Sequence, residues 1–140
     1  MKLTSNKIKI SVIIPIYNGG KYMNYSLRSI QNQKMKDIEI IIIDDNSKDD
    51  SLKIIQNYMK NDKRIKLIKN KENRRILFSK SIGALNSKGE FIIEIDQDDL
   101  IIKKNSFILL YRQSFKNKLS LLHFQFVSGN NPLNMPKVKI

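Results

Sequence analysis

Short apolar runs alternate with segments of helical spacing along the 140-residue chain. The apolar runs are rich in β-branched isoleucine and valine, which favour strands. Between them, apolar residues recur every three or four positions, as in a helix with one buried face. The pattern predicts strands at 8–17, 38–43, 65–68, 91–95 and 119–127, and helices at 21–33, 47–61, 75–87 and 104–116.

The second predicted strand indicates how the sheet is built. Residues 38–43 are isoleucine at every position except Glu39, which is typical of a strand buried on both faces. Strands that alternate with helices form βαβ units with parallel strands. The sequence therefore predicts an α/β fold, a mostly parallel sheet with helices on both faces, in a single domain over 1–140 with a loop tail at 128–140.

Polar residues mark the expected helix ends. Ser47, followed three residues later by Asp50, is predicted to cap the second helix, and Asn73 to cap the third. Gly89 stands just beyond the third helix, where a glycine commonly ends one. These residues set the predicted helix boundaries.

Composition restricts the class of protein. No apolar run approaches the roughly 20 residues that span a bilayer, and the basic, apolar start has no small-residue cleavage site of a signal peptide. The chain contains no cysteine, which excludes disulfides and Cys-ligated zinc. We therefore expect a cytoplasmic protein.

The chain is strongly basic, with 26 Lys and Arg against 13 Asp and Glu and a net charge of +13. Three explanations are open: a lysine-rich composition, attraction to an anionic ligand or an anionic membrane surface, and nucleic-acid binding. The lysines are scattered, and no aromatic residues interleave with them in an RNA-binding pattern, so we expect no specific nucleic-acid partner. Peripheral association with a membrane stays an alternative.

Three predicted strands end in polar residues. PIYNGG at 15–20 follows the first, DDNS at 44–47 follows the second, and DQDD at 96–99 follows the fourth. In a parallel α/β sheet, ligands bind beyond the carboxyl ends of the strands. The sequence therefore predicts that these segments open onto one edge of the sheet.

The acidic segment at 96–99 has two interpretations. Carboxylates this close in sequence repel one another unless a cation intervenes. Mg²⁺ commonly binds through one or two carboxylates plus substrate phosphates, so the acids could hold a metal under a diphosphate. A solvated turn at an acidic helix N-terminus would need no metal. The segments at 15–20 and 44–47 likewise have plain interpretations as turns and helix caps.

Taken together, four stretches resemble the family 2 glycosyltransferases, which have the GT-A fold. They are SVIIPIYNGGKY, DIEIIIIDDNSKDDSL, RRILFSKSIGALNSKGEFI and EIDQDD, in the family's order and spacing between 11 and 100. The resemblance implies a Rossmann-like, donor-binding N-terminal half. It implies transfer of a sugar from a nucleotide-diphosphate donor, usually UDP-linked, to an unknown glycan, lipid or protein acceptor.

The resemblance also implies roles for particular residues. It implies that Pro15 and Tyr17 lie against the nucleobase, that Asp45 hydrogen-bonds the base, and that Lys80 approaches the nucleotide. The family's aspartate motif contacts the ribose and binds Mn²⁺ or Mg²⁺ under the diphosphate. In this chain the motif corresponds to Asp96, Asp98 and Asp99, with the metal expected at Asp98 and Asp99.

The chain departs from the family pattern at two informative positions. Arg75 stands where the family often has glycine, and Lys80 where it often has arginine, which removes a forked donor. The family's catalytic base and acceptor-binding half lie beyond the aspartate motif, so no catalytic residue is assigned. Two alternatives stay open: a nucleotide-sugar binder without turnover, and a receiver-like signalling domain, because IEIIIIDDNS resembles that domain's acidic pair after a strand.

Overall fold

The computed structural model describes residues 7–119, so nearly all of the predicted strand at 119–127, and the tail at 128–140, lie outside the described residues. Strands and helices alternate in the predicted order. The elements are β1 (Ile10–Ile16), α1 (Met23–Gln31), β2 (Ile38–Asp44), α2 (Ser51–Asn61), β3 (Ile65–Lys69), α3 (Arg75–Leu85), β4 (Phe91–Glu94) and α4 (Ser106–Lys116).

Within the described residues the strands form one four-stranded parallel sheet in the order β3-β2-β1-β4. The chain steps outward from β1 to β3 and then returns to place β4 on the other side of β1. This order contradicts the receiver-like alternative, because that fold has the order 2-1-3-4-5. It also creates a switch point between β1 and β4, where open α/β sheets form their ligand crevice.

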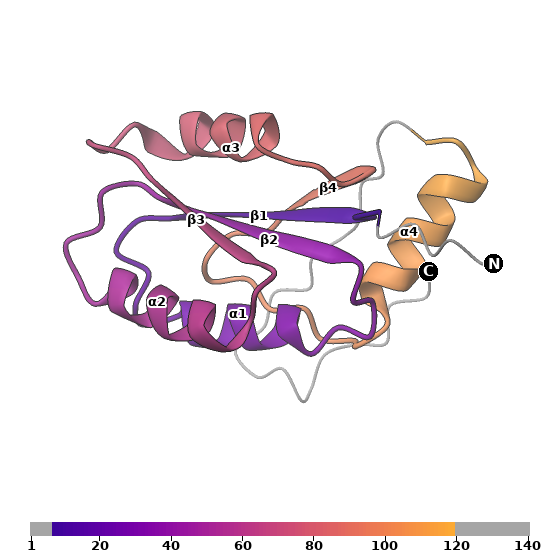
Figure 1. The fold of residues 1–140 in the computed structure, drawn as a ribbon, viewed down its shortest axis with the longest axis horizontal. Coiled ribbons are helices and arrows are strands. Elements are labelled where there is room, and N and C mark those ends of the chain that lie inside the picture. The colour runs from indigo at the N-terminus through magenta and orange to yellow at the C-terminus, as the bar shows by residue number, and fades with distance from the viewer. Residues whose placement is uncertain (1–6, 120–140) are drawn as a thin grey trace.

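Helices cover both faces of the sheet, as the sequence predicts. Figure 1 shows α1 and α2 on one side of the strands and α3 on the other. The two faces correspond to alternate residues of β1 and β2, since successive side chains of a strand point in opposite directions. Val12 and Ile40 join the core against α1 and α2, whereas Ile13 and Ile41 form the smaller core on the α3 face.

Gly83 lets helix α3 pack its backbone directly against the side chains of the sheet. A β-carbon at this position would lie 2.5 Å from Cγ2 of Ile13 and 2.9 Å from Cδ1 of Ile43. Only the bare backbone of glycine leaves room for both isoleucines. The close contact holds α3 against β1 and β2 and so positions its first turn relative to the strand ends.

The predicted cap at Ser47 is wrong. Helix α2 begins at Ser51 behind Asp50, whose side chain makes no cap bond, and Asp49 Oδ1 accepts a hydrogen bond from the Ser51 N–H at 3.0 Å. The Ser47 hydroxyl instead accepts a hydrogen bond from the backbone N–H of Asn18 at 3.0 Å, because tertiary contact with the loop after β1 outcompetes local capping. Asn73 keeps a capping role, since its Oδ1 accepts a hydrogen bond from the N–H of Arg75 at 3.1 Å.

The glutamate that interrupts the isoleucine run is a buried structural charge. The hydroxyl of Ser11 and the N–H of Lys88 each donate to Glu39 Oε1 at 2.6 Å, and Lys66 Nζ donates to Oε2 at 2.6 Å. Burial raises the pKa of this carboxyl, but the hydrogen bonds from Lys66, Ser11 and Lys88 outweigh it and leave the pKa below its usual value of 4.5. Glu39 belongs to the amino-terminal end of β2, far along the strand from the polar segment that follows Asp44.

Candidate functional site

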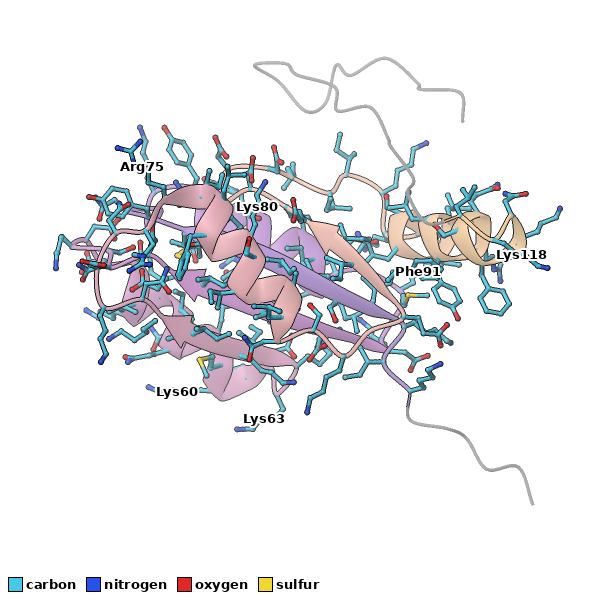
Figure 2. All side chains as sticks on the ribbon, turned by 90° about the horizontal axis from the view of Figure 1, so that it is seen from above. Lys60, Lys63, Arg75, Lys80, Phe91 and Lys118 are labelled. Carbon is cyan, nitrogen blue, oxygen red and sulfur yellow. The ribbon has the colours of Figure 1, made fainter. Side chains whose placement is uncertain are left out.

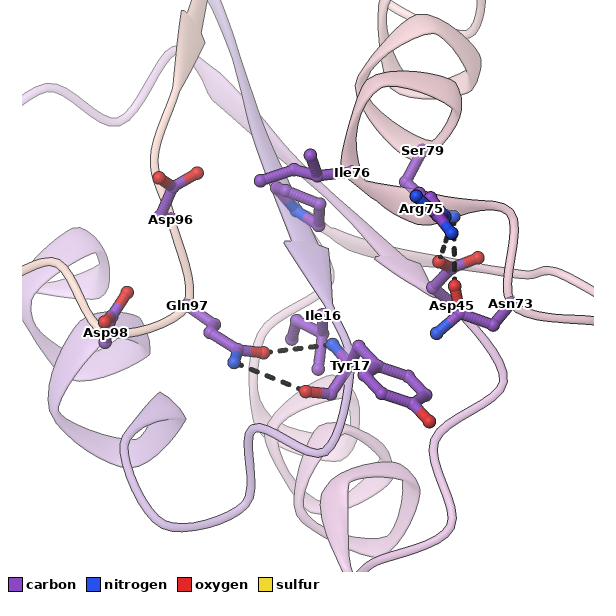
Figure 3. A pocket seen from close by; sticks show the side chains of 11 residues that line it. Ile16, Tyr17, Asp45, Asn73, Arg75, Ile76, Ser79, Asp96, Gln97 and Asp98 are labelled. Carbon is purple, nitrogen blue, oxygen red and sulfur yellow. Dashed lines mark hydrogen bonds between the residues drawn. The ribbon is translucent and has the colours of Figure 1, made fainter.

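A pocket of about 310 Å³ opens where β1 and β2 end and α3 begins. It lies at the switch point of the sheet, because the segment after β4 forms one wall (Figure 3). Its size is at the lower end of the range for small-molecule sites. The lining residues are Pro15, Ile16, Tyr17, Asp45, Asn73, Arg75, Ile76, Ser79, Asp96, Gln97 and Asp98. All three polar strand ends therefore meet at one edge, as predicted.

The first wall is the end of β1, where Pro15 and Tyr17 lie. Gln97 connects this wall to the segment after β4: its Oε1 accepts from the Tyr17 N–H at 3.0 Å, and its Nε2 donates to the Tyr17 carbonyl at 3.3 Å. A β-carbon at Gly19 would lie 2.5 Å from Gln97 Oε1. A small residue at that position therefore leaves room for the amide of Gln97, a contact that the sequence pattern did not predict.

The loops after β1 and β2 are tied together by side chains. Residues 44–47 form a turn, which was one of the two interpretations of this segment from the sequence: the N–H of Ser47 donates to Asp44 Oδ1 at 3.2 Å. Three backbone N–H groups after β1 donate across to the second loop: Asn18 to Ser47 Oγ at 3.0 Å, Gly19 to Ser51 Oγ at 2.9 Å, and Gly20 to Asp49 Oδ2 at 3.0 Å. The two loops therefore form one supported rim beside the pocket.

Asp45 lines the pocket and also holds the start of α3. Its Oδ1 accepts from Asn70 Nδ2 at 2.7 Å and from the Arg74 N–H at 2.9 Å, and its Oδ2 accepts from the Arg75 N–H at 2.8 Å. Two of these donors are backbone N–H groups at a helix start, which have no partner within the helix. A carboxylate has about four acceptor positions, so a position is left for a donor from a ligand.

Lys80 does not line the pocket but contacts a residue that does. Its Nζ lies 3.2 Å from Asp96 Oδ1 and 3.5 Å from Glu94 Oε2. Burial lowers the pKa of Lys80, and the hydrogen bond and charge of Asp96, together with Glu94, outweigh that effect and raise it above its usual value. Lys80 thus stays charged and neutralises part of the acidic wall.

The acidic segment divides into a residue at the pocket and one behind it. Asp98 is exposed and lines the pocket, whereas Asp99 is half-buried, and its Oδ2 accepts a 3.4 Å hydrogen bond from the Asp96 N–H. Burial is the largest cause that raises the pKa of Asp99, and the charges of Asp96 and Asp98 add to it. The mutual repulsion expected from the sequence is therefore present.

The donor set can be tested against a divalent cation. Residues 7–119 contain no group of three or more Asp, Glu, His or Cys side chains that could enclose one, so protein side chains alone do not form a cage there. Among the same residues, the buried Asp96 Oδ1 has no polar partner other than the ammonium of Lys80, 3.2 Å away. This oxygen and the exposed carboxylate of Asp98 fit a cation whose other ligands are substrate phosphates and water.

Arg75 lies at the site, although the sequence identified it only as a departure from the glycine that is common in the family at this position. It begins α3 with φ at 68°, in the left-handed region that favours glycine, and it lines the pocket. A glycine would adopt this conformation without strain, which explains why glycine suits the position. Among the described residues that line the pocket, Arg75 carries the only positive charge and Asp45, Asp96 and Asp98 carry the negative ones.

The geometry agrees with the comparison to known protein families. The family model described as glycosyl transferase family 2 matches residues 11–135, most of the chain. The chain belongs to glycosyl transferase family 2. The match extends well past the predicted motifs, which end near residue 100.

A curated family 2 relative and two solved structures are informative. The GalNAc(5)-diNAcBac-PP-undecaprenol beta-1,3-glucosyltransferase of Campylobacter jejuni is 40% identical over 95 residues, 67% of this chain and 31% of the relative. The crystal structure of Staphylococcus aureus TarS 1–349 in complex with UDP has a TM-score of 0.72 and 26% identity, covering 79% of this chain and 33% of TarS. The mannosyltransferase PcManGT of Pyrobaculum calidifontis, in complex with GDP-Man and Mn²⁺, has a TM-score of 0.67 over 72% of this chain and 30% of its own; at 19% identity it shows the fold alone.

These comparisons confirm the predicted fold and family membership. The sheet and helices are the N-terminal, GT-A part of a family 2 glycosyltransferase. The chain spans about a third of the length of the curated relatives that it matches first. None of the helices formed by residues 7–119 is long and apolar enough to cross a bilayer.

Proposed function

We propose that this chain binds the donor in a glycosyltransferase that transfers a sugar from a nucleotide-diphosphate sugar, with UDP as the nucleotide. The observation that carries the proposal is the pocket at the switch point, where Tyr17, Asp45, Asp96 and Asp98 meet. The structural likeness to TarS with UDP supports the nucleotide. In the reaction, an acceptor hydroxyl bonds to the anomeric carbon, the bond from that carbon to the diphosphate breaks, and the hydroxyl proton passes to a base.

Different pocket residues would contact different parts of the donor. The ring of Tyr17 is half exposed at the pocket and can stack on a flat base, while Pro15 forms the apolar floor beside it. Asp45 is already fixed by its three donors, so its remaining acceptor position is preorganised for an N–H of uracil. Asp96 faces the ribose, and Lys80 supports it from behind through their ion pair.

Asp98 and Asp99 would hold Mn²⁺ or Mg²⁺ together with the diphosphate oxygens. When bound, the cation would neutralise the negative charge that develops on the leaving nucleotide. Asp98 places a hard carboxylate oxygen at the pocket wall, as such cations require, and Asp99 lies half-buried directly behind it. Because these acids repel a diphosphate, donor binding to the pocket should depend on the cation.

Calorimetry of the full chain with UDP, with and without Mn²⁺, tests this proposal. We expect binding in the presence of Mn²⁺ and a large loss without it or in Asp98→Asn. Asp50→Asn is the matched control, because Asp50 is an exposed acid at the start of α2 that makes no side-chain cap bond. Absence of metal-dependent UDP binding would contradict the proposal.

The acceptor and the place of action follow from the same proposal. The Campylobacter relative acts on a sugar chain linked to undecaprenol through a pyrophosphate, as its name states. We propose a lipid-linked acceptor for this chain too, with the protein peripheral to the cytoplasmic side of a membrane. The alternative of a nucleotide-sugar binder without turnover stays a prediction, and an assay for hydrolysis or transfer of the bound donor distinguishes it.

A further inference from the structure

The outer face of α3 is apolar although it faces away from the sheet. Leu77 and Leu85 are 78% and 82% exposed, and they lie two turns apart on one stripe with Ser81 between them. Phe78 is also partly exposed beside this stripe. Figure 2 looks onto α3, which lies in front of the sheet and carries Arg75 and Lys80. We propose that this face docks on an anionic lipid bilayer.

The corresponding face of α2, on the other side of the sheet, has ordinary solvated residues. Its exposed positions include Lys53, Gln56, Asn57 and Lys60. Both helices have eleven residues and pack on the same sheet. Helix length and packing on the sheet therefore do not explain why α3 exposes large apolar side chains and α2 exposes polar ones. Large exposed apolar residues that gather on one helix indicate a surface that is covered in use.

Charge around the α3 face identifies the occupant. Between residues 69 and 88 the chain has a single acid, Glu72, which pairs with Arg74. Of the other bases in this segment, Lys80 pairs with Glu94 and Asp96, whereas no acid of the described residues lies within ion-pair distance of Lys69, Lys71, Arg75 and Lys88. The guanidinium of Arg74 lies over the Phe78 ring, 4.5 Å from its centroid, so an aromatic ring and a cation share one spot. Apolar residues edged by Lys and Arg are the features by which interfacial helices bind anionic lipid.

A second copy of the chain is a poorer occupant. Pairing α3 with α3 across a two-fold axis would bring two basic surfaces face to face. Like charges at such an interface cost binding energy, whereas anionic headgroups gain from them. The surface thus favours a lipid bilayer over self-association.

Docking on this face would bring the pocket to the membrane surface. Ile76, in the first turn of α3, both lines the pocket and is 49% exposed next to the apolar face. The site would then open beside the headgroups, where a lipid-linked acceptor presents its sugar. The placement of the pocket beside a lipid-linked acceptor rests on the proposed function, whereas the docking of α3 on the bilayer does not.

The test is co-sedimentation of the full chain with vesicles of phosphatidylglycerol and phosphatidylcholine, or of phosphatidylcholine alone. We expect binding to the anionic vesicles that is partly retained at high salt, since salt screens charge but not apolar contact. The double variant Leu77→Gln, Leu85→Gln should weaken binding at least about tenfold, because two leucines leave the lipid. The matched control Lys53→Gln, Lys60→Gln on α2 should change it by less than about threefold.

Three results would overturn the inference: no binding to anionic vesicles, equal binding by the leucine variant, or an equal loss in the α2 control. A dimer in sedimentation velocity that the leucine substitutions dissociate would assign the face to a second copy instead. UDP binding is measured on the same proteins, and Leu77→Gln, Leu85→Gln should not change it. Vesicle binding and donor binding can therefore fail separately.

Discussion

The side-chain amide of Gln97 pairs with the backbone of Tyr17, donating to its carbonyl at 3.3 Å and accepting from its N–H at 3.0 Å. The pair bridges the switch point beyond the end of β4, where the β1–β4 ladder has already stopped at Glu94. A side chain here takes the place of a neighbouring strand. It fixes the end of β1 relative to the acidic segment that follows β4.

Gln97→Glu should weaken UDP binding by about fivefold, the effect of roughly one hydrogen bond. The substitution replaces the donating amide with a carboxylate oxygen, which repels the Tyr17 carbonyl and adds negative charge to the pocket wall. Calorimetry with UDP and Mn²⁺ measures the change. Gln56→Glu, an exposed change of the same chemistry on α2, should have no effect, and equal affinities for all three proteins would contradict the role of Gln97.

Gly83→Ala should lower the free energy of unfolding by about 1–3 kcal/mol, as overpacking of a tight core does. The added carbon would lie within 3 Å of Ile13 and Ile43, so α3 must move away from the sheet. Urea denaturation measures the loss. Ser81→Ala, an exposed change on the same helix, serves as the control; if Gly83→Ala were as stable as this control, the packing of α3 would differ from that described.

Arg75→Gly should be more stable than Arg75→Ala by about 1 kcal/mol, because φ at this position is 68° and only glycine adopts it without a steric penalty. Both substitutions remove the guanidinium, so their difference reports the backbone conformation alone. Thermal or urea unfolding of the two variants gives the comparison. A more stable alanine variant would show that residue 75 is not left-handed in solution.

Stability should fall as the pH drops from about 4 toward 2. Hydrogen bonds from Arg64 lower the pKa of Asp62 from 3.8 to about 2, against the opposing effect of burial, and Gln31 adds to the lowering. The pKa of Glu39 is also lowered, from 4.5. A carboxyl whose pKa is lower in the folded state stabilises the protein above its unfolded pKa and loses that contribution on protonation.

Urea midpoints measured at several pH values from 5.5 to 2.5 check this prediction. Asp62→Asn should be less stable near neutral pH and should show a shallower decline with acid, because it has no proton to gain. Asn61→Ser, a neutral change next to Asp62, should keep the slope of the unmodified chain. An identical acid dependence with and without Asp62 would mean that its ion pair with Arg64 is absent in solution.

Much of the fold was predictable because buried apolar residues recur at regular spacing along strands and helices. A strand covered on both faces must be apolar at successive positions, and 38–43 is so except at Glu39. The gathering of 15–20, 44–47 and 96–99 at one edge followed from parallel strands alone. Ser47 was misassigned because local capping rules do not include Asn18, which is 29 residues away and contacts it only in the fold.

Local pattern and residue type in the chain were sufficient for the succession of strands and helices, the parallel sheet and the acidic end of the fourth strand. Each of these depends on contacts that repeat at short, regular spacing. Only the tertiary structure determined the features that depend on contacts between distant residues: Asp45 holds the start of α3, and Gln97 joins Tyr17. The contact with Asp45 also accompanies the left-handed backbone of Arg75 beside the pocket. Such pairs leave no period in the sequence, because each is made once, between segments that only the packed sheet brings together.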